Sequence, residues 1–198
     1  KRGDIDVSAT AYAQGFLGAT PTPDGDVPGL GADLLTVAPY MGLDTLRSFA
    51  TVARANGAGI VVLVRTSNPG AADLEDARLA DGTAVWERVA QLVAQLGDEH
   101  VGTESGLTDV GAVLGATHPE HLARARELLP RTIFLLPGVG AQGGRVEDLA
   151  PAFAPGRAAG LVTASRSIVD AHVHGGGAPV AAARAEAERL RAAAWSLR

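Results

Sequence analysis

Short apolar runs, each rich in Val, Leu or Ile, recur along the chain with longer mixed stretches between them. Near-continuous apolar runs of this length are typical of parallel β-strands that are buried on both faces. We therefore predict strands at residues 33–37, 59–65, 110–114, 132–136 and 160–164.

The longer stretches between these runs are helical candidates. We predict helices at residues 9–18, 44–56, 83–96, 119–129, 146–153 and 179–195. Thr117 before Pro119 is a helix start signal, and Asn56-Gly57 is a stop signal. The alternation of strands and helices predicts one α/β domain over residues 1–198, without an internal linker.

Polar and glycine-rich segments stand where a predicted strand meets the following helix, at residues 67–70, 115–117, 137–144 and 165–167. In a (β/α)8 (TIM) barrel, the loops at these strand ends form the active-site face. Only five strands are visible, and a typical barrel has about 250 residues. We expect residues 1–198 to carry strands 4–8 and the end of strand 3, with further βα units upstream of Lys1.

Composition narrows the class of protein. The chain is 46% hydrophobic and 20% charged, with a net charge of −5. Its basic residues are dispersed, which argues against a nucleic-acid surface. Cysteine is absent, so disulfides, thiolate metal sites and cysteine nucleophiles are excluded for this sequence. No apolar run reaches the roughly 18–20 residues that span a bilayer. We expect a cytoplasmic enzyme without a membrane partner.

Lys1 is the only lysine, whereas sixteen arginines supply the other strong cations. A guanidinium does not release its proton near neutral pH, but an ammonium can. A single lysine in such a chain therefore suggests proton donation. A solvated residue at the chain end is the alternative that composition alone leaves open.

The segment Gly138-Val-Gly140-Ala-Gln142-Gly143 matches the dinucleotide pattern G-x-G-x-x-G. That pattern normally opens the first βα unit, and here it comes late in the chain, which argues against a nicotinamide cofactor. Anion binding explains the segment better: glycine backbone N–H groups, Gln142 and Arg166 could hold a phosphate. Barrel enzymes often bind phosphate with their last two strand loops.

Two histidine pairs, His118 with His121 and His172 with His174, raise the question of a metal. Neither pair comes with an obvious carboxylate as third ligand. We interpret these residues as helix-start and loop histidines, and expect no metal site.

Taken together, Lys1-Arg-Gly-Asp4-Ile5, the segments 67–70 and 137–144, and Ser165-Arg166 resemble the orotidine 5′-phosphate decarboxylase family, most closely its mycobacterial-type subgroup. The similarity runs the whole length of the chain. The family signature is Asp-x-Lys-x-x-Asp-Ile. Lys1 matches its lysine, and Asp4 and Ile5 match its last two positions, whereas its first aspartate would lie two residues before Lys1.

The resemblance implies a function and a site. The reaction converts orotidine 5′-monophosphate to uridine 5′-monophosphate and CO2 in pyrimidine biosynthesis, without metal or cofactor. Lys1 and Asp4 would be catalytic, in a homodimer where Asp4 and Ser8 reach the neighbouring subunit's site. Ser8 is the weaker assignment, because the subgroup often writes Asp-Ile-Gly-Ser-Thr here. The resemblance places the substrate against Ile5, Ser8, Ser67, Pro137, Gln142, Ser165 and Arg166.

The residue types suit that chemistry. Loss of CO2 from C6 of the pyrimidine leaves a carbanion, which a nearby ammonium can stabilise and protonate. Two alternatives remain. One is another phosphate-binding barrel enzyme, of the ribulose-phosphate epimerase or hexulose-phosphate synthase type, although those depend on metal ligands. The other is a catalytically silent, dimerising fragment.

Overall fold

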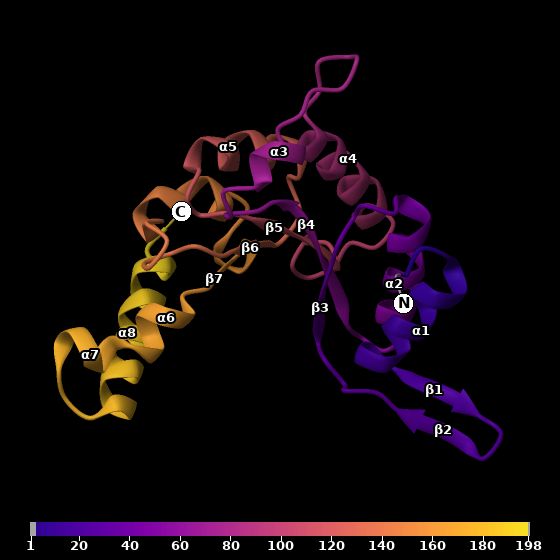
Figure 1. The fold of residues 1–198 in the computed structure, drawn as a ribbon, viewed down its shortest axis with the longest axis horizontal. Helices are drawn as coiled ribbons and strands as arrows, with labels where there is room; N and C mark the ends of the chain where they lie inside the picture. The colour runs from indigo at the N-terminus through magenta and orange to yellow at the C-terminus, as the bar shows by residue number, and fades with distance from the viewer. Residues whose placement is uncertain (1–2, 198) are drawn as a thin grey trace.

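The computed structural model describes residues 3–197 of the chain. Its main sheet has five parallel strands, each hydrogen-bonded to the next in chain order, and a separate two-stranded antiparallel hairpin lies beside it (Figure 1). The hairpin consists of β1 (Ala19–Thr22) and β2 (Gly25–Pro28), and the sheet of β3 (Leu34–Val37), β4 (Gly59–Arg65), β5 (Val110–Leu114), β6 (Phe134–Leu136) and β7 (Gly160–Val162).

Helices occupy the connections between the strands and the end of the chain. They are α1 (Asp6–Leu17), α2 (Leu43–Ala55), α3 (Ala71–Leu74), α4 (Val85–Gly97), α5 (Pro119–Leu128), the 3₁₀ helices η1 (Val146–Phe153) and η2 (Arg157–Ala159), α6 (Ser165–Val169), α7 (Ala171–Gly175) and α8 (Pro179–Trp195). Among residues 3–197, no helix combines the length and the apolar character that crossing a membrane requires.

The core forms where the middle of the sheet meets its helices. Every residue of β5 is buried, as are six of the seven residues of β4, so both faces of these strands are covered. Helices α2 and α4 pack on this part of the sheet and bury Leu46 and Val93 against it. Burial on both faces explains why these two strands read as unbroken apolar runs.

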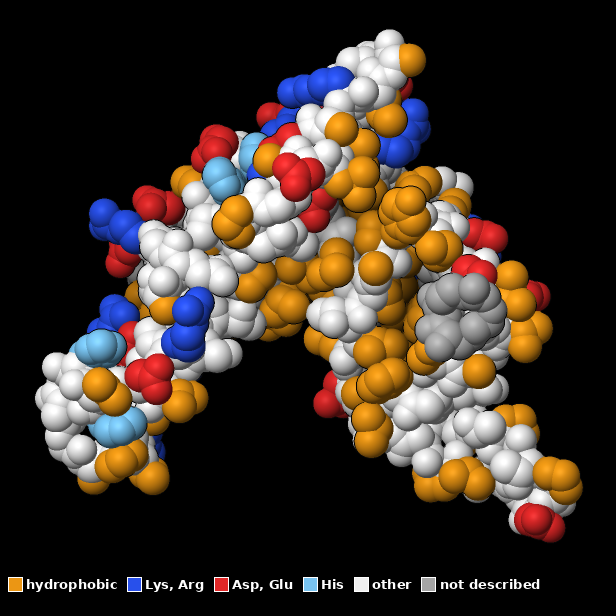
Figure 2. Space-filling view, in the orientation of Figure 1, with side chains coloured by type: hydrophobic (Ala, Val, Ile, Leu, Met, Phe, Trp, Pro, Cys, Tyr) orange, Lys and Arg blue, Asp and Glu red, His pale blue; other side chains and the backbone are white. Residues whose placement is uncertain are grey.

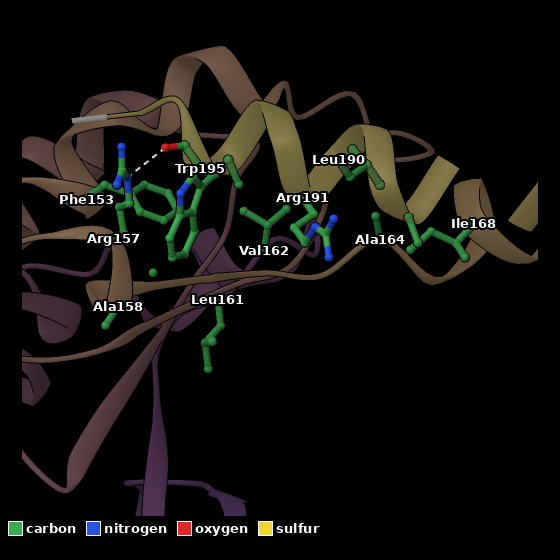
Figure 3. A pocket seen from close by; sticks show the side chains of 13 residues that line it. Phe153, Arg157, Ala158, Leu161, Val162, Ala164, Ile168, Leu190, Arg191 and Trp195 are labelled. Atoms are coloured by element: carbon green, nitrogen blue, oxygen red, sulfur yellow. Dashed lines mark hydrogen bonds between the residues drawn. The ribbon is translucent and has the colours of Figure 1, made fainter. Parts of the chain in front are cut away.

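The two outer strands of the sheet each pair on one side only within the described residues. Each carries an exposed leucine, Leu34 in β3 at 49% and Leu161 in β7 at 40%. Figure 2 shows hydrophobic side chains gathered along the hollowed underside of the molecule. An apolar cavity of about 400 Å³ lies between β7 and α8, and Leu161, Leu190 and Trp195 line it (Figure 3). Both edges of the sheet therefore present apolar surface.

All five predicted strands are confirmed, and the helix predicted at 179–195 has those bounds in the structure. Residues 146–153 form a 3₁₀ helix instead of an α-helix; Pro151 lies inside it and has no N–H to donate. The β1–β2 hairpin interrupts the predicted alternation of strands and helices. Helix α5 begins at Pro119 as predicted, but the residue that caps its start is His118 and not Thr117, while Asn56 is confirmed as the stop after the last residue of α2.

Candidate active site

The polar segments that follow β4, β5, β6 and β7 lie at one edge of the sheet, because the strands are parallel. Two of these segments are in direct contact. The Ser67 hydroxyl after β4 donates a hydrogen bond of 2.9 Å to Oε1 of Gln142 after β6, across 75 positions of sequence. These two loops therefore lie together at the carboxyl ends of the strands, and that they form a binding site stays a prediction.

Two glycines allow this contact. A Cβ at Gly115 would lie 2.9 Å from the Ser67 Cα, and a Cβ at Gly138 would lie 2.9 Å from Gln142 Oε1. Gly138 also has a φ of +102°, which favours glycine. Side chains at either position would therefore separate Ser67 from Gln142.

The Gln142 carboxamide is oriented by this bond. Its Oε1 accepts the Ser67 proton, so its Nε2 keeps two N–H groups to donate to oxygen atoms of a ligand. Within residues 3–197, no acceptor takes a hydrogen bond from that Nε2. A molecule with carbonyl or phosphate oxygens could therefore bind against Gln142.

A small cavity of about 190 Å³ adjoins Gln142. Its lining includes four residues assigned above by resemblance: Pro137, Gln142, Ser165 and Arg166. Arg166 is exposed, and no carboxylate of the described chain pairs with its guanidinium. A cation beside a neutral amide donor is a suitable environment for a phosphate.

The expectation that the glycine loop presents its N–H groups to an anion is wrong for three of them. The N–H groups of Gly140, Gly143 and Gly144 donate to carbonyls of the same loop, at 2.9, 2.8 and 3.0 Å. These bonds close the turn and hold Gln142 at its tip. Anion recognition here consequently depends on side chains more than on these amides.

Of the signature segment, Lys1 lies outside the described residues. Gly3 lines a cavity together with Val37 and Ala38, so Gly3 lies beside the carboxyl end of β3. Asp4 is half-buried and Ile5 is 53% exposed.

The Ser8 hydroxyl is engaged with its own helix. It donates to the Ile5 carbonyl at 3.1 Å and accepts from the Ile5 N–H at 3.4 Å. Ser8 therefore caps the first turn of α1. A ribose contact from Ser8 stays a prediction.

Sequence reasoning missed the groups that surround Ser67. Arg65, the last residue of β4, is only 5% exposed and bonds to Asp76, 11 residues along the chain. The signal available was an arginine that closes an otherwise apolar strand, with the acidic pair Glu75-Asp76 shortly after it.

The interpretation of His118 and His121 needs one correction. A carboxylate does accompany them: Glu120 Oε1 lies 3.1 Å from His118 Nδ1, and ligand atoms of all three residues lie within 4.8 Å of one another. His118 is nevertheless the residue before α5, as a helix-start histidine should be. Burial and the nearby charge of Arg65 lower the pKa of His121, and a neighbouring guanidinium also opposes a bound cation.

The fold and the site together define an α/β protein that carries its polar chemistry at the carboxyl ends of parallel strands, as (β/α)8-barrel enzymes do. The chain belongs to the orotidine 5′-phosphate decarboxylase / HUMPS family, whose model matches residues 1–185.

Two curated relatives, both named orotidine 5′-phosphate decarboxylase, illustrate the similarity. The protein of Deinococcus radiodurans is 46% identical over 191 residues, which cover 96% of this chain and 63% of the relative. The protein of Rhodopirellula baltica is 44% identical over 172 residues, which cover 87% and 55%. The chain thus spans little more than half the length of these relatives.

Solved structures show the same likeness in three dimensions. Leishmania donovani OMP decarboxylase superposes with a TM-score of 0.69 at 30% identity, covering 99% of this chain and 67% of that one. Leishmania donovani UMP synthase gives a TM-score of 0.71 at 32% identity, covering 99% and 38%.

Proposed function

We propose that the full-length protein decarboxylates orotidine 5′-monophosphate to uridine 5′-monophosphate. The observation that carries this proposal is the Ser67–Gln142 hydrogen bond beside the Arg166 cavity, in a chain of this family. Ser67 would read the pyrimidine edge, and Gln142 and Arg166 would hold the phosphate. The phosphate would then lie away from the reacting carbon, so that its binding energy can order the site.

Proton transfer would be carried out by the signature segment, residues 1–5. Lys1 would hold its ammonium beside C6, stabilise the developing carbanion and deliver the proton that replaces CO2. Asp4 of the partner subunit would help to hold that ammonium in place. The position of Gly3 at the end of β3, on the edge that carries Ser67, supports this arrangement.

The barrel proposed from sequence also has structural support. We assign β3 to β7 as strands 4–8 of a (β/α)8 barrel. Within residues 3–197 both outer strands have an unpaired edge, and the apolar cavity beside β7 is a suitable place for another βα unit to pack (Figure 3). Closing the barrel would cover Leu34 and Leu161, whose exposure is otherwise costly.

The proposed assembly is a homodimer in which Asp4 and Ser8 serve the neighbour's site. Exposed apolar residues along α1 support an interface there: Val7 is 71% exposed, Tyr12 37% and Phe16 39%. We propose a cytoplasmic location from the metabolic role alone.

The proposed function is tested by following the absorbance of orotidine 5′-monophosphate with full-length protein after exhaustive chelation. We expect turnover to continue without added metal. Absence of turnover would refute the function, and activity that returns only with Zn²⁺ or Mg²⁺ would refute the metal-free mechanism.

A further inference from the structure

Arg65 is a buried charged residue at the carboxyl end of β4, two positions before Ser67. Its Nε and Nη2 donate to the two carboxylate oxygens of Asp76 at 2.8 and 2.9 Å, and its Nη1 donates to the Thr66 carbonyl at 2.6 Å. A bidentate arginine–carboxylate pair fixes direction as well as distance. The first residue after β4 is therefore held through its carbonyl.

Glu75 holds the same residue from its other side. Its carboxylate accepts from the Thr66 N–H at 2.8 Å, and its carbonyl accepts from the Trp86 N–H at 2.9 Å. The Thr66 hydroxyl, which has one proton, lies 2.9 Å from Glu75 Oε1 and 2.6 Å from Asn68 Oδ1. The N–H, carbonyl and hydroxyl of Thr66 are thus all bonded. The next residue along the chain is Ser67.

The end of β4 is also irregular, which explains why such anchoring is needed. The pairing of β4 with β5 shifts register between Leu63 and Arg65. Beyond the shift, the Arg65 carbonyl accepts from the Gly115 N–H at 2.7 Å, and Gly115 passes closely beneath Ser67. The regular ladder therefore does not by itself set the direction in which Ser67 points.

Burying a guanidinium is costly in free energy unless its donors all have hydrogen-bond partners. The presence of Arg65 in a strand that is otherwise apolar therefore indicates a role for it. Hydrogen bonding from Arg65 lowers the pKa of Asp76, which keeps the pair charged at neutral pH. We propose that Arg65, anchored by Asp76 and Glu75, is a positioning residue that holds Ser67 opposite Gln142. In its kinetic consequence this inference rests on the proposed decarboxylase activity.

The test compares two aspartates that each accept a bidentate arginine. Asp76→Asn weakens the Arg65 pair beside the site. Asp109→Asn weakens the Arg54 pair, at 2.7 and 3.2 Å, which lies before β5 at the opposite end of the sheet. Asp76 is 37% exposed and Asp109 16%, so the control is the more buried of the two carboxylates.

In crystal structures of the two full-length variants, we expect the Ser67–Gln142 hydrogen bond to be broken in Asp76→Asn and intact in Asp109→Asn. This readout does not depend on the reaction that the protein catalyses. An unchanged 2.9 Å contact in Asp76→Asn would overturn the inference.

Kinetics supply a second arm through a double-mutant cycle. In the wild-type background, Asp76→Asn should lower kcat/KM by about tenfold. In a Ser67→Ala background the same change should lower it by less than about twofold, because Asp76 acts through Ser67. Equal losses in both backgrounds would mean that Asp76 acts independently of Ser67. A wild-type protein that turns over no substrate would refute the proposed function and leave the crystallographic arm to decide.

Discussion

At the scale of single residues, the site depends on a few polar groups whose partners are limited. Ser67 and Gln142 satisfy each other in part, and Arg166 stands exposed with its donors available. Neutral and charged donors are thus arranged around one small cavity. The two proposed roles, recognition of the pyrimidine ring by Ser67 and binding of the phosphate by Arg166, can be tested separately.

Arg166→Ala should lower kcat/KM for orotidine 5′-monophosphate by at least about tenfold, because a charge-assisted contact contributes roughly 1.5–3 kcal/mol. The same change should barely affect turnover of orotidine, which lacks the phosphate. Steady-state kinetics on the two substrates make the comparison. Equal losses on both would assign Arg166 to the fold or to the reacting carbon.

His121 gives a pH dependence of stability. Its pKa is lowered in the folded protein, chiefly by burial, whereas in the unfolded chain it is about 6.5. Below about pH 6.5 the unfolded state therefore binds more protons, and the stabilisation present at higher pH is lost as pH falls. The difference in Tm between pH 7.5 and pH 5.5 should be smaller in His121→Gln than in wild type. An identical pH effect in both proteins would contradict this reading.

At the scale of elements, buried polar contacts join segments whose association the pattern of apolar residues does not predict. Arg126 of α5 stacks on Phe134 of β6, 3.6 Å from the ring centroid. Its guanidinium donates to the carbonyls of Leu129 and Thr132 at 2.7 and 2.8 Å and to that of Ala152 in η1 at 2.5 Å. Burial lowers the pKa of Arg126 to about 10, so it remains charged at neutral pH.

Arg126→Met should lower the free energy of unfolding by about 3 kcal/mol or more, because it leaves several buried carbonyls without donors. Arg124→Met on the same helix is the matched control. It removes surface ion pairs to Glu87 and Glu127 and should cost less than about 1 kcal/mol. Urea unfolding measures both, and similar costs would refute a structural role for Arg126.

The elements that can be predicted well from the sequence are those whose buried residues form a recognisable pattern of apolar positions. Strand β5 is buried on both faces, and α8 begins with a proline at its first position. The β1–β2 hairpin left no such pattern because its strands are almost wholly exposed and contain prolines. The Arg65–Asp76 pair could be predicted only in part: the sequence places the acidic pair Glu75-Asp76 shortly after a strand-end arginine, but it does not indicate which of the two carboxylates the arginine meets. The glycine N–H groups were assigned wrongly because their partners lie inside the loop itself.

At the scale of the whole molecule, the described chain is an open sheet with apolar surface at both edges (Figure 2). Its candidate site lies at the carboxyl ends of the strands, and Gly3 lies beside the end of the first of them. The proposed barrel closure and the proposed shared site of a homodimer are both compatible with this arrangement.

The shared site predicts complementation between two inactive dimers. Lys1→Ala and Asp4→Ala homodimers should each be nearly inactive. Subunit exchange should yield heterodimers in which one pocket carries both changes and the other carries neither, so activity should return to that second pocket. Activity assays on heterodimers verified by mass spectrometry make the test. If they stay inactive, Asp4 acts within its own subunit or the proposed dimer is wrong.

The central claim, that this site decarboxylates by proton donation from a single lysine, is tested most directly at Lys1. We measure kcat for orotidine 5′-monophosphate in full-length wild type, Lys1→Ala and Lys1→Arg. Both changes should lower kcat by at least roughly 10³-fold, because arginine restores the charge but holds its proton too tightly. Near-native turnover in Lys1→Ala would contradict the account.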